Sequence, residues 1–398
     1  MRYLMKLILH YTCLALWCIV PATALAFDYL QVLPAEPLVP THNPLTHQKI
    51  ALGKQLFFDK RLSIHQSLSC NDCHNLFLGG DNDEARAVGA SGLKTRRNVP
   101  TLLNIGLQTV YHWDGRFESL EQQAIEHIKD PNVMGINNVS ALLKRLTNDK
   151  EYQQHFTAAF GETGTSNAIN LVNIANALSS FQRSLLTPNS PFDQYLMGNK
   201  NALSSAAIRG MTLFNETGCL ACHFGVNFAG PAPGPALGLG DGFYELFPNY
   251  LGSAYDTSHQ LVNDLGRFEF SKDNDERYMW RVPPLRNIAL NAPYFHNGSA
   301  KTLKEAIIIM AKTQTNKTLS EQEISDIEAF LNSLTGELPQ TLRPAQTSSH
   351  NTKQNPRASH YGNNSGDKNG GNSDSNSDSN RSDDNNGKMT ITVKDLLN

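Results

Sequence analysis

Apolar residues recur at helical spacing wherever the chain shows a readable pattern. They repeat every three or four positions over residues 139–146 and 169–186, which predicts two amphipathic helices. Ser320 and Glu323 have the spacing of a capping box that opens a third helix. The apolar face of this helix consists of Ile324, Ile327, Phe330, Leu331 and Leu334. Gly336 suits its C-terminal stop. No segment alternates convincingly as a strand does, so the pattern predicts an all-α fold.

Three stretches interrupt the helical pattern. Residues 224–275 are rich in Gly, Pro and Asn, which predicts mostly loop. Residues 188–200 contain two prolines, a glycine and two asparagines, which is typical of a linker between two halves. Residues 348–387 are dominated by Asn, Ser, Asp and Gly, and such a composition has no apolar surface to bury. We therefore predict two domains, over residues 27–187 and 188–347, and a disordered tail over residues 348–398.

The first 26 residues have the pattern of a secretory signal peptide. Arg2 and Lys6 precede a mostly apolar run over residues 7–20, and Ala24-Leu25-Ala26 is a small-x-small cleavage signal. The alternative is a membrane anchor, but the run is shorter than the ~20 residues that a spanning helix needs. We therefore expect an exported protein that is cleaved after Ala26.

Composition and charge narrow the class of protein. The chain has 398 residues, of which 40% are hydrophobic and 18% charged, and this is typical of a soluble protein with about two domains. The formal net charge is −3, so nothing in the charge favours a nucleic-acid partner.

The cysteines indicate the chemistry. Six are present, and Cys13 and Cys18 leave with the signal peptide. The other four form two C-x-x-C-H motifs, Cys70-Asn71-Asp72-Cys73-His74 and Cys219-Leu220-Ala221-Cys222-His223. Two disulfides, a zinc site or thioredoxin-like pairs are the alternatives. A zinc site needs further ligands, and a redox pair does not need a histidine directly after each second cysteine.

A C-x-x-C-H motif suits covalent attachment of haem c. The two cysteines lie about one helical turn apart and form thioethers with the haem vinyl groups, and the histidine reaches the iron. We therefore predict two haem c groups with His74 and His223 as proximal ligands. The opposite face of each iron then decides function, because an iron filled on both faces transfers electrons and an open iron carries out chemistry.

Further segments place the chain beside a known family. They are LGKQLFFD at 52–59, RNVPT at 97–101, WDGR at 113–116, VPPLRN at 282–287 and APYFHNG at 292–298. With the two haem motifs, they resemble the bacterial diheme cytochrome c peroxidases and their MauG-type relatives, from about residue 44 to about residue 338. The resemblance implies two cytochrome c-like helical domains whose haems face a shared interface.

The resemblance also implies roles for single residues. The N-terminal haem is the peroxidatic one, and the C-terminal haem receives electrons and carries a methionine ligand fourteen residues after the histidine of the Y-F-H motif. That histidine is His296 here, and Met310 stands at the required spacing. By pattern alone, Met310 is equally a core residue of a helix. Trp113 corresponds to the tryptophan that carries electrons between the two haems.

A calcium ion is a further expectation from the family. Asn98 and the backbone carbonyls of Asn291 and Pro293 correspond to the family's interdomain calcium ligands, and such oxygens suit calcium. The family commonly has threonine where this chain has Asn291, and a backbone ligand tolerates that difference.

The chain departs from the family at the peroxidatic haem. Ala90 stands where many members have a histidine that blocks the iron, so we expect an open first iron. Gln123 matches the pocket glutamine, but Val133 replaces the catalytic glutamate ten residues later and cannot move a proton. His127 lies four residues after Gln123, on the same face of a continuing helix. It is interpreted as a replacement acid–base group, as an iron ligand or as a solvent-facing bystander.

Three functions follow from these residues. The leading hypothesis is a periplasmic peroxidase that reduces hydrogen peroxide with electrons from a small donor such as a cytochrome c. The second is a MauG-like enzyme that oxidises residues of a partner protein. MauG has a tyrosine in place of Met310 and a tryptophan in place of Thr217, which favours the peroxidase, whereas Ala90 favours MauG. The third is a diheme electron carrier or peroxide sensor, which Val133 favours.

Overall fold

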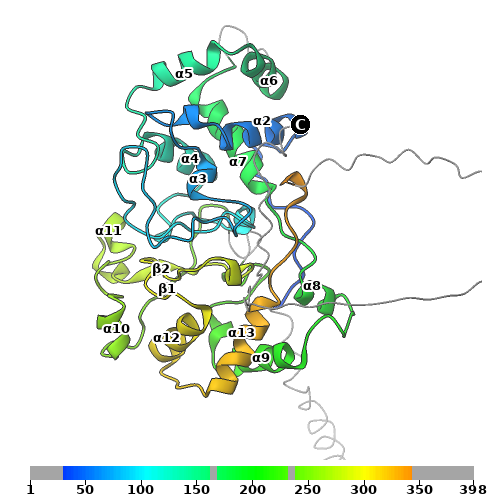
Figure 1. Ribbon diagram of the computed structural model, residues 1–398, viewed down its shortest axis with the longest axis vertical. Coiled ribbons are helices and arrows are strands. Elements are labelled where there is room, and N and C mark those ends of the chain that lie inside the picture. The colour runs from blue at the N-terminus through cyan, green and yellow to red at the C-terminus, as the bar shows by residue number, and fades with distance from the viewer. Residues whose placement is uncertain (1–29, 162–167, 232–237, 343–398) are drawn as a thin grey trace, which may run out of the picture. The chain divides into compact units, whose positions relative to one another are not determined.

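The computed structural model describes residues 30–161, 168–231 and 238–342. The signal peptide and the tail predicted for residues 348–398 lie outside these ranges. The N-terminal half contains α2 (His47–Phe57), α3 (Cys70–Cys73), α4 (Leu120–Lys129), α5 (Val139–Thr147), α6 (Lys150–Phe160) and α7 (Leu171–Arg183). The C-terminal half contains α8 (Pro191–Leu196), α9 (Ser205–Glu216), α10 (Ala254–Ser258), α11 (Phe268–Ser271), α12 (Leu303–Thr315) and α13 (Glu321–Asn332) (Figure 1).

Short 3₁₀ turns and two strands complete the described elements. The turns are η1 (Lys60–Leu62), η2 (Ile105–Leu107), η3 (Cys219–Ala221), η4 (Asn274–Glu276), η5 (Ile288–Leu290) and η6 (Gln340–Leu342). The helices predicted over residues 139–146 and 169–186 are confirmed as α5 and α7. The capping box of Ser320 and Glu323 is also confirmed, because each side chain accepts the backbone N–H of the other at the start of α13.

In the N-terminal half, α2 packs along α7, and α4 packs against α7. The crossing of α2 and α7 depends on Gly53, because a Cβ atom there would lie 2.0 Å from the carbonyl oxygen of Ala177. Phe57 and Phe181 meet edge to face beside this crossing, and both are fully buried. The close approach holds α4 beside the core, and α4 carries Gln123 and His127.

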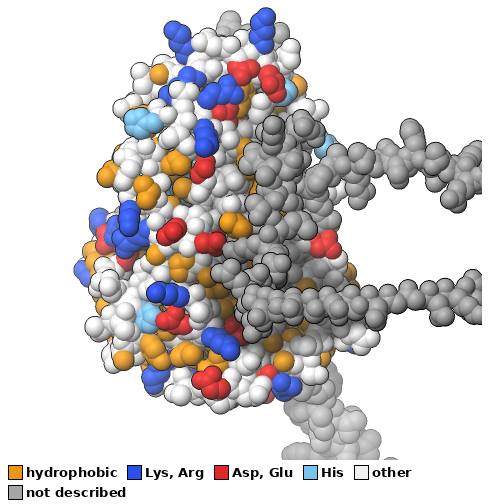
Figure 2. All heavy atoms as spheres, viewed as in Figure 1, with side chains coloured by type: hydrophobic (Ala, Val, Ile, Leu, Met, Phe, Trp, Pro, Cys, Tyr) orange, Lys and Arg blue, Asp and Glu red, His pale blue; other side chains and the backbone are white. Residues whose placement is uncertain are grey.

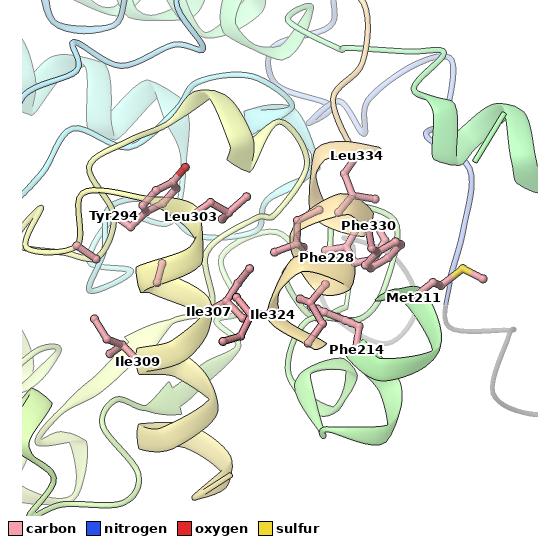
Figure 3. Close-up of a cluster of buried hydrophobic side chains, with 14 of the residues drawn as sticks. Met211, Phe214, Phe228, Tyr294, Leu303, Ile307, Ile309, Ile324, Phe330 and Leu334 are labelled. Atoms are coloured by element: carbon pink, nitrogen blue, oxygen red, sulfur yellow. The ribbon is translucent and has the colours of Figure 1, made fainter. Parts of the chain in front are cut away.

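In the C-terminal half, α9 packs along α13, and α12 packs against α13 (Figure 1). Their shared core contains Phe214 of α9, Phe330 of α13, Ile307 of α12 and Phe228 from the segment after the second haem motif (Figure 3). Gly210 allows the α9–α13 contact, since a Cβ atom there would lie 1.8 Å from the carbonyl oxygen of Asp326. This core positions α12, which carries Met310.

The described part of the chain is mostly helical but not all-α. Strands β1 (Tyr244–Leu246) and β2 (Met279–Arg281) pair antiparallel, with Glu245 opposite Trp280. Each strand has three residues, which is too short to show a period of two in the sequence. The expectation of no strand was therefore wrong at this pair, while residues 224–275 are otherwise mostly loop, as predicted.

Two other expectations are corrected. The predicted linker contains helix α8, which begins with a capping box of Ser190 and Asp193 and buries Phe192 in the C-terminal core. Gly336 does not stop α13, which already ends at Asn332. Instead, Gly336 allows a close approach of two backbones, because a Cβ atom there would lie 2.0 Å from the carbonyl oxygen of Thr187.

Buried ion pairs connect the two halves. Arg97 is 8% exposed and binds Asp114 of its own half and Asp264 of the other half, at 2.5 and 2.8 Å. On the face in Figure 2, basic and acidic side chains are interspersed with apolar ones. Among the described residues, no helix is both long and apolar enough to cross a bilayer. The predicted boundary at residues 187 and 188 stays a prediction.

Candidate functional site

The first C-x-x-C-H motif folds as a single helical turn that fixes its histidine. Ser69 caps α3 through Asp72, and His74 donates its backbone N–H to the carbonyl of Cys70 at 2.9 Å. The Nδ1–H of the His74 ring faces the carbonyl oxygens of Gly80 and Pro100, at 3.3 and 3.1 Å. Since these partners only accept hydrogen bonds, the proton is on Nδ1 and Nε2 is the free nitrogen. Burial lowers the pKa of His74 to about 4, so the ring is neutral, as an iron ligand must be.

The second motif fixes its histidine through the same hydrogen bonds, but it folds as a 3₁₀ turn and not as an α-helical turn. Cys219 begins the turn η3, and His223 donates its backbone N–H to the carbonyl of Cys219 at 3.0 Å. Its Nδ1–H donates to the carbonyl of Phe228 at 2.9 Å, and burial lowers its pKa. The two histidines therefore both present a neutral Nε2, each fixed by backbone carbonyls, as metal-binding histidines usually are.

The four described cysteines are free thiols. Burial raises the pKa of Cys70 to about 12 and the pKa values of Cys73 and Cys222 to about 11. Burial also raises the pKa of Cys219. A thiol with a raised pKa carries little thiolate and is a poor redox or metal-binding group. The two disulfides that were one alternative are not formed, and the thiols fit thioether formation better than thiolate chemistry.

A cavity of about 450 Å³ adjoins the second motif. Cys219, Cys222 and His223 line it, and so does Met310 of α12. Its volume is within the usual range for a cofactor site, and its walls are mostly apolar. The donor set of two thiols, an imidazole and a thioether fits a haem c with His–Met ligation.

Aromatic residues from both halves of the chain line this cavity. Trp113 lines the same cavity and donates its indole N–H to the carbonyl of Asn98 at 2.9 Å. Its own carbonyl accepts the backbone N–H of Arg281, from the other half, at 3.0 Å. Trp280 stacks on His296 with ring centroids 4.2 Å apart. Trp113 is thus fixed at the contact between the two halves.

His296 lines this cavity and has a ring nitrogen without a hydrogen-bond partner in the part of the chain that the structure describes. Its side chain is 2% exposed, and its Nε2 has no hydrogen bond within the described residues. Burial lowers the pKa of His296 to about 4. A buried polar group without a partner costs free energy, so this nitrogen is suited to a polar group of the ligand that fills the cavity.

Helix α4 brings Gln123 and His127 together as the four-residue spacing predicted. Gln123 Nε2 donates to His127 Nδ1 at 2.9 Å. His127 Nε2 lies 2.8 Å from Nε2 of His112, a residue that no sequence pattern indicated. Burial, together with the neighbouring His74 ring and the charge of Arg116, lowers the pKa of His127 to about 3. The interpretation of His127 as a solvent-facing bystander does not fit a ring that is hydrogen-bonded at both nitrogens.

Val133 lies in the loop that follows α4. The backbone carbonyl of Val133 accepts the N–H of Ala90 at 2.8 Å, so the segments that contain these two residues are joined through main-chain groups. Neither side chain can bind iron or carry a proton. The hydrogen-bonded side chains of Gln123, His127 and His112 therefore supply the polar chemistry near the first motif.

The residues expected to bind calcium, Asn98, Asn291 and Pro293, all line the cavity beside the second motif. The side-chain Oδ1 of Asn291 is buried and has no partner within the described residues, while its Nδ2 donates to the carbonyl of Gly79 at 2.8 Å. An orphaned amide oxygen beside backbone carbonyls is compatible with a calcium ligand set.

Comparison with known proteins agrees with this geometry. The profile of the di-haem cytochrome c peroxidases matches residues 47–201, and the cytochrome c profile matches residues 207–335. Cytochrome c551 peroxidase of Pseudomonas aeruginosa is 37% identical over 314 residues, which cover 79% of this chain and 86% of that protein. Methylamine utilization protein MauG of Methylorubrum extorquens is 34% identical over 311 residues, covering 75% of this chain and 81% of MauG.

A solved structure extends the comparison to three dimensions. The crystal structure of a MauG-like protein associated with microbial copper homeostasis is 30% identical, with a TM-score of 0.66, and the match covers 77% of this chain and 94% of that one. The profiles, the relatives and the two matching histidine sites agree. The chain therefore belongs to the di-haem cytochrome c peroxidase and MauG family of oxidoreductases.

Proposed function

We propose that the protein is a periplasmic diheme peroxidase that reduces hydrogen peroxide to water with electrons from a small donor such as a cytochrome c. The observation that carries the proposal is the pair of neutral histidines, His74 and His223, each fixed through Nδ1 and free at Nε2. Cys70 and Cys73 would hold the first haem c, and Cys219 and Cys222 the second. The haem irons supply the redox centres for peroxide cleavage and for electron storage.

The two sites differ in what faces the proximal histidine. Met310 lines the cavity beside the second motif, and thioether ligation raises a haem's potential, which suits an electron store. Near the first motif, the polar groups are those of Gln123 and His127, which suit a substrate pocket. Trp113 lies at the contact between the halves and is the residue that we assign to electron transfer between the sites.

In this proposal, His127 is the acid–base group that replaces the missing glutamate. Cleavage of the peroxide O–O bond needs a proton taken from one oxygen and a proton given to the other. Gln123 orients the His127 ring through Nδ1, and a neutral imidazole can carry the proton. We expect His127→Ala to slow the reaction with peroxide by about 10²–10⁴-fold, and we expect Val133→Glu to restore the rate in that variant.

Calcium and export complete the proposal. Asn98 and the carbonyls of Asn291 and Pro293 would hold one calcium ion at the contact between the halves, and the unpartnered Asn291 Oδ1 supports such a site. The sequence of the first 26 residues supports export to the periplasm with cleavage after Ala26. An intact mass that corresponds to the chain from Phe27 with two haems would support both attachment and cleavage.

A MauG-like oxidation of a partner protein is the second candidate. It is favoured by the solved MauG-like relative and by Ala90, which leaves the first iron open. Met310 and Thr217 oppose it, since MauG has tyrosine and tryptophan at these places. A carrier or sensor without catalysis is the third candidate and rests on Val133.

One experiment separates the three candidates. The ferric protein is studied by electron paramagnetic resonance, and then peroxide consumption is measured with a reduced cytochrome c as donor. A high-spin signal in the resting protein followed by stoichiometric oxidation of the donor supports the peroxidase. Two low-spin haems and no reaction with peroxide would instead indicate the carrier. Reaction with peroxide without oxidation of the donor would indicate the partner-oxidising enzyme.

A further inference from the structure

His112 contacts His127 near the first haem motif, and the proposed mechanism has not used it. It precedes Trp113 directly and has a left-handed backbone conformation, with φ of 71°. Such a conformation is uncommon outside glycine and clusters at functional sites. Arg281 holds it from the other half by donating Nε–H to the carbonyl of His112 at 2.9 Å. The fold therefore fixes this histidine in an unfavourable conformation beside His127.

The hydrogen bonds determine which nitrogen of each ring carries the proton. The amide nitrogen of Gln123 only donates, so His127 Nδ1 must accept, and the proton of neutral His127 is on Nε2. That Nε2–H points at Nε2 of His112, 2.8 Å away, so Nε2 of His112 is an acceptor. The two rings thus present one proton donor and one proton acceptor to each other.

We propose that His112 and His127 act together on peroxide, with His127 Nε2–H as the proton donor and His112 Nε2 as the proton acceptor. This inference rests on the proposed peroxidase function. Peroxide would take the place of the direct contact between the two nitrogens. The rings meet edge to face with centroids 4.8 Å apart, and the entry of peroxide requires them to turn away from each other. Heterolysis of peroxide needs a donor and an acceptor on opposite oxygens, and this pair offers one of each.

The step balances in protons and electrons. The proton of the inner oxygen passes to His112, and the His127 proton passes to the outer oxygen. The O–O bond breaks with its electron pair on the outer oxygen, which leaves as water. His112 then carries protons on both nitrogens and His127 on neither, and transfer of the Nε2 proton of His112 to Nε2 of His127, 2.8 Å away, restores two neutral rings. The inner oxygen becomes the second water by taking two protons from solvent, and the one-electron protein donor supplies the two electrons that the whole reaction consumes.

The surroundings favour this single shared proton. Burial, the neighbouring His127 and the positive charges of Arg116, Arg97 and Arg281 hold the pKa of His112 well below its ordinary value. A second proton would place two N–H groups against each other across 2.8 Å. The pair is therefore kept neutral, and one histidine accepts a proton only as the other gives one away.

The test uses the holoprotein with two probes. Hydrogen peroxide needs both the donor and the acceptor, whereas hydrogen cyanide only gives up a proton as cyanide binds an open iron. His112→Asn is the main variant, because asparagine tolerates the left-handed backbone but cannot hold the proton. His112→Gln is the second variant in case the first folds poorly. Phe117→Leu is the matched control, since Phe117 packs against the His112 ring at 4.8 Å and carries no proton.

The expected pattern assigns each role. His112→Asn slows both the peroxide reaction and cyanide association by about 10²–10⁴-fold. His127→Phe slows the peroxide reaction by a similar factor but leaves cyanide association within a few-fold of the parent. The double variant reacts with peroxide no more slowly than either single variant, because the two residues act as a unit. Phe117→Leu leaves both rates within a few-fold of the parent.

Other patterns overturn the inference. If His112→Asn and His112→Gln react with peroxide as fast as the parent, His112 has no part in the chemistry. If only His127→Phe slows cyanide association, the donor and acceptor roles are wrong. A parent that binds cyanide with the expected dependence on His112 but never consumes peroxide would contradict the proposed function and leave the assignment of the pair intact.

Discussion

Arg286 offers a test of how the second haem site is held. Its side chain is fully buried and makes two hydrogen bonds to Asp193, at 3.0 and 2.9 Å. It also donates to the backbone carbonyls of Val226 and Gln31, at 2.6 and 3.0 Å. Asp193 is 1% exposed and belongs to the capping box of α8. Arg286→Met would remove the cationic partner of the buried Asp193 carboxylate, which would keep only the neutral donors of Leu33 and Ser190, and would remove one donor from the carbonyls of Val226 and Gln31.

The expected cost follows from burial. Removing one partner of a buried ion pair typically costs about 3–5 kcal/mol, because the other charge stays in a poorly solvated place. We expect Arg286→Met to lower the free energy of unfolding at pH 7 by about this amount. Urea unfolding of the haem-loaded protein, followed by circular dichroism, measures it. The loss of Val226 as a fixed point also loosens the segment that carries Phe228, whose carbonyl orients His223.

The same pair predicts a pH dependence. Burial alone would raise the pKa of Asp193, but the charge and hydrogen bonds of Arg286 outweigh it and hold that pKa below its usual value. A carboxyl with a lowered folded pKa stabilises the protein above its unfolded pKa, which is about 3.9, and loses this contribution as pH falls through the folded value. The stability of the parent should therefore fall in this acidic range, and part of this dependence should disappear in Arg286→Met.

A double variant controls for loss of volume. Asp193→Asn combined with Arg286→Met removes both charges, so it should be more stable than Arg286→Met alone. A single variant that loses less than about 1 kcal/mol would refute the reasoning, since this is the size of an exposed pair. A double variant that is less stable than the single one would show that packing and not charge dominates.

Three further predictions concern other parts of the fold. Gly210→Ala should destabilise the protein in thermal unfolding, because its Cβ would meet the carbonyl oxygen of Asp326 at 1.8 Å, whereas Gly161→Ala has open space at its Cβ and should cost less despite its left-handed backbone. Burial raises the pKa of Asp81 to about 7, so the folded state binds a proton that the unfolded state releases. Stability should fall as pH rises from about 4 towards 7, and unfolding curves of Asp81→Asn should show a smaller fall. Met310→Ala should lower the potential of the C-terminal haem, and an unchanged redox titration would rule out this ligand.

The parts of the protein that the sequence predicts are those that depend on near neighbours in the chain. The helices α5 and α7 follow from apolar spacing, because a helix repeats every 3.6 residues whatever it packs against. The capping box of α13 spans three residues, and Gln123 and His127 are four residues apart on one helix. Each haem motif likewise joins its histidine to its first cysteine through a backbone hydrogen bond within the same turn. These predictions need no knowledge of the rest of the fold.

Contacts between segments that are distant in the chain could not be predicted from the sequence. The pairing of β1 with β2 joins residues more than thirty positions apart, and neither strand is long enough to show a pattern of its own. The predicted linker contains helix α8, because Phe192 packs into a core to which α9 and α13 contribute. The sequence predicted that Gly336 ends a helix, but its lack of a side chain instead allows its backbone to lie close to the backbone of Thr187.

The same division applies to the site. Sequence alone could name His127, because Gln123 stands one helical turn before it, but it left open whether the ring meets solvent or substrate. Only the tertiary structure brings His112 to 2.8 Å from it, across fifteen residues that include the turn with Trp113. Which nitrogen donates and which accepts depends on three side chains from two segments, and hydrogen bonds of this kind are set by the packing of those segments and not by their order in the chain.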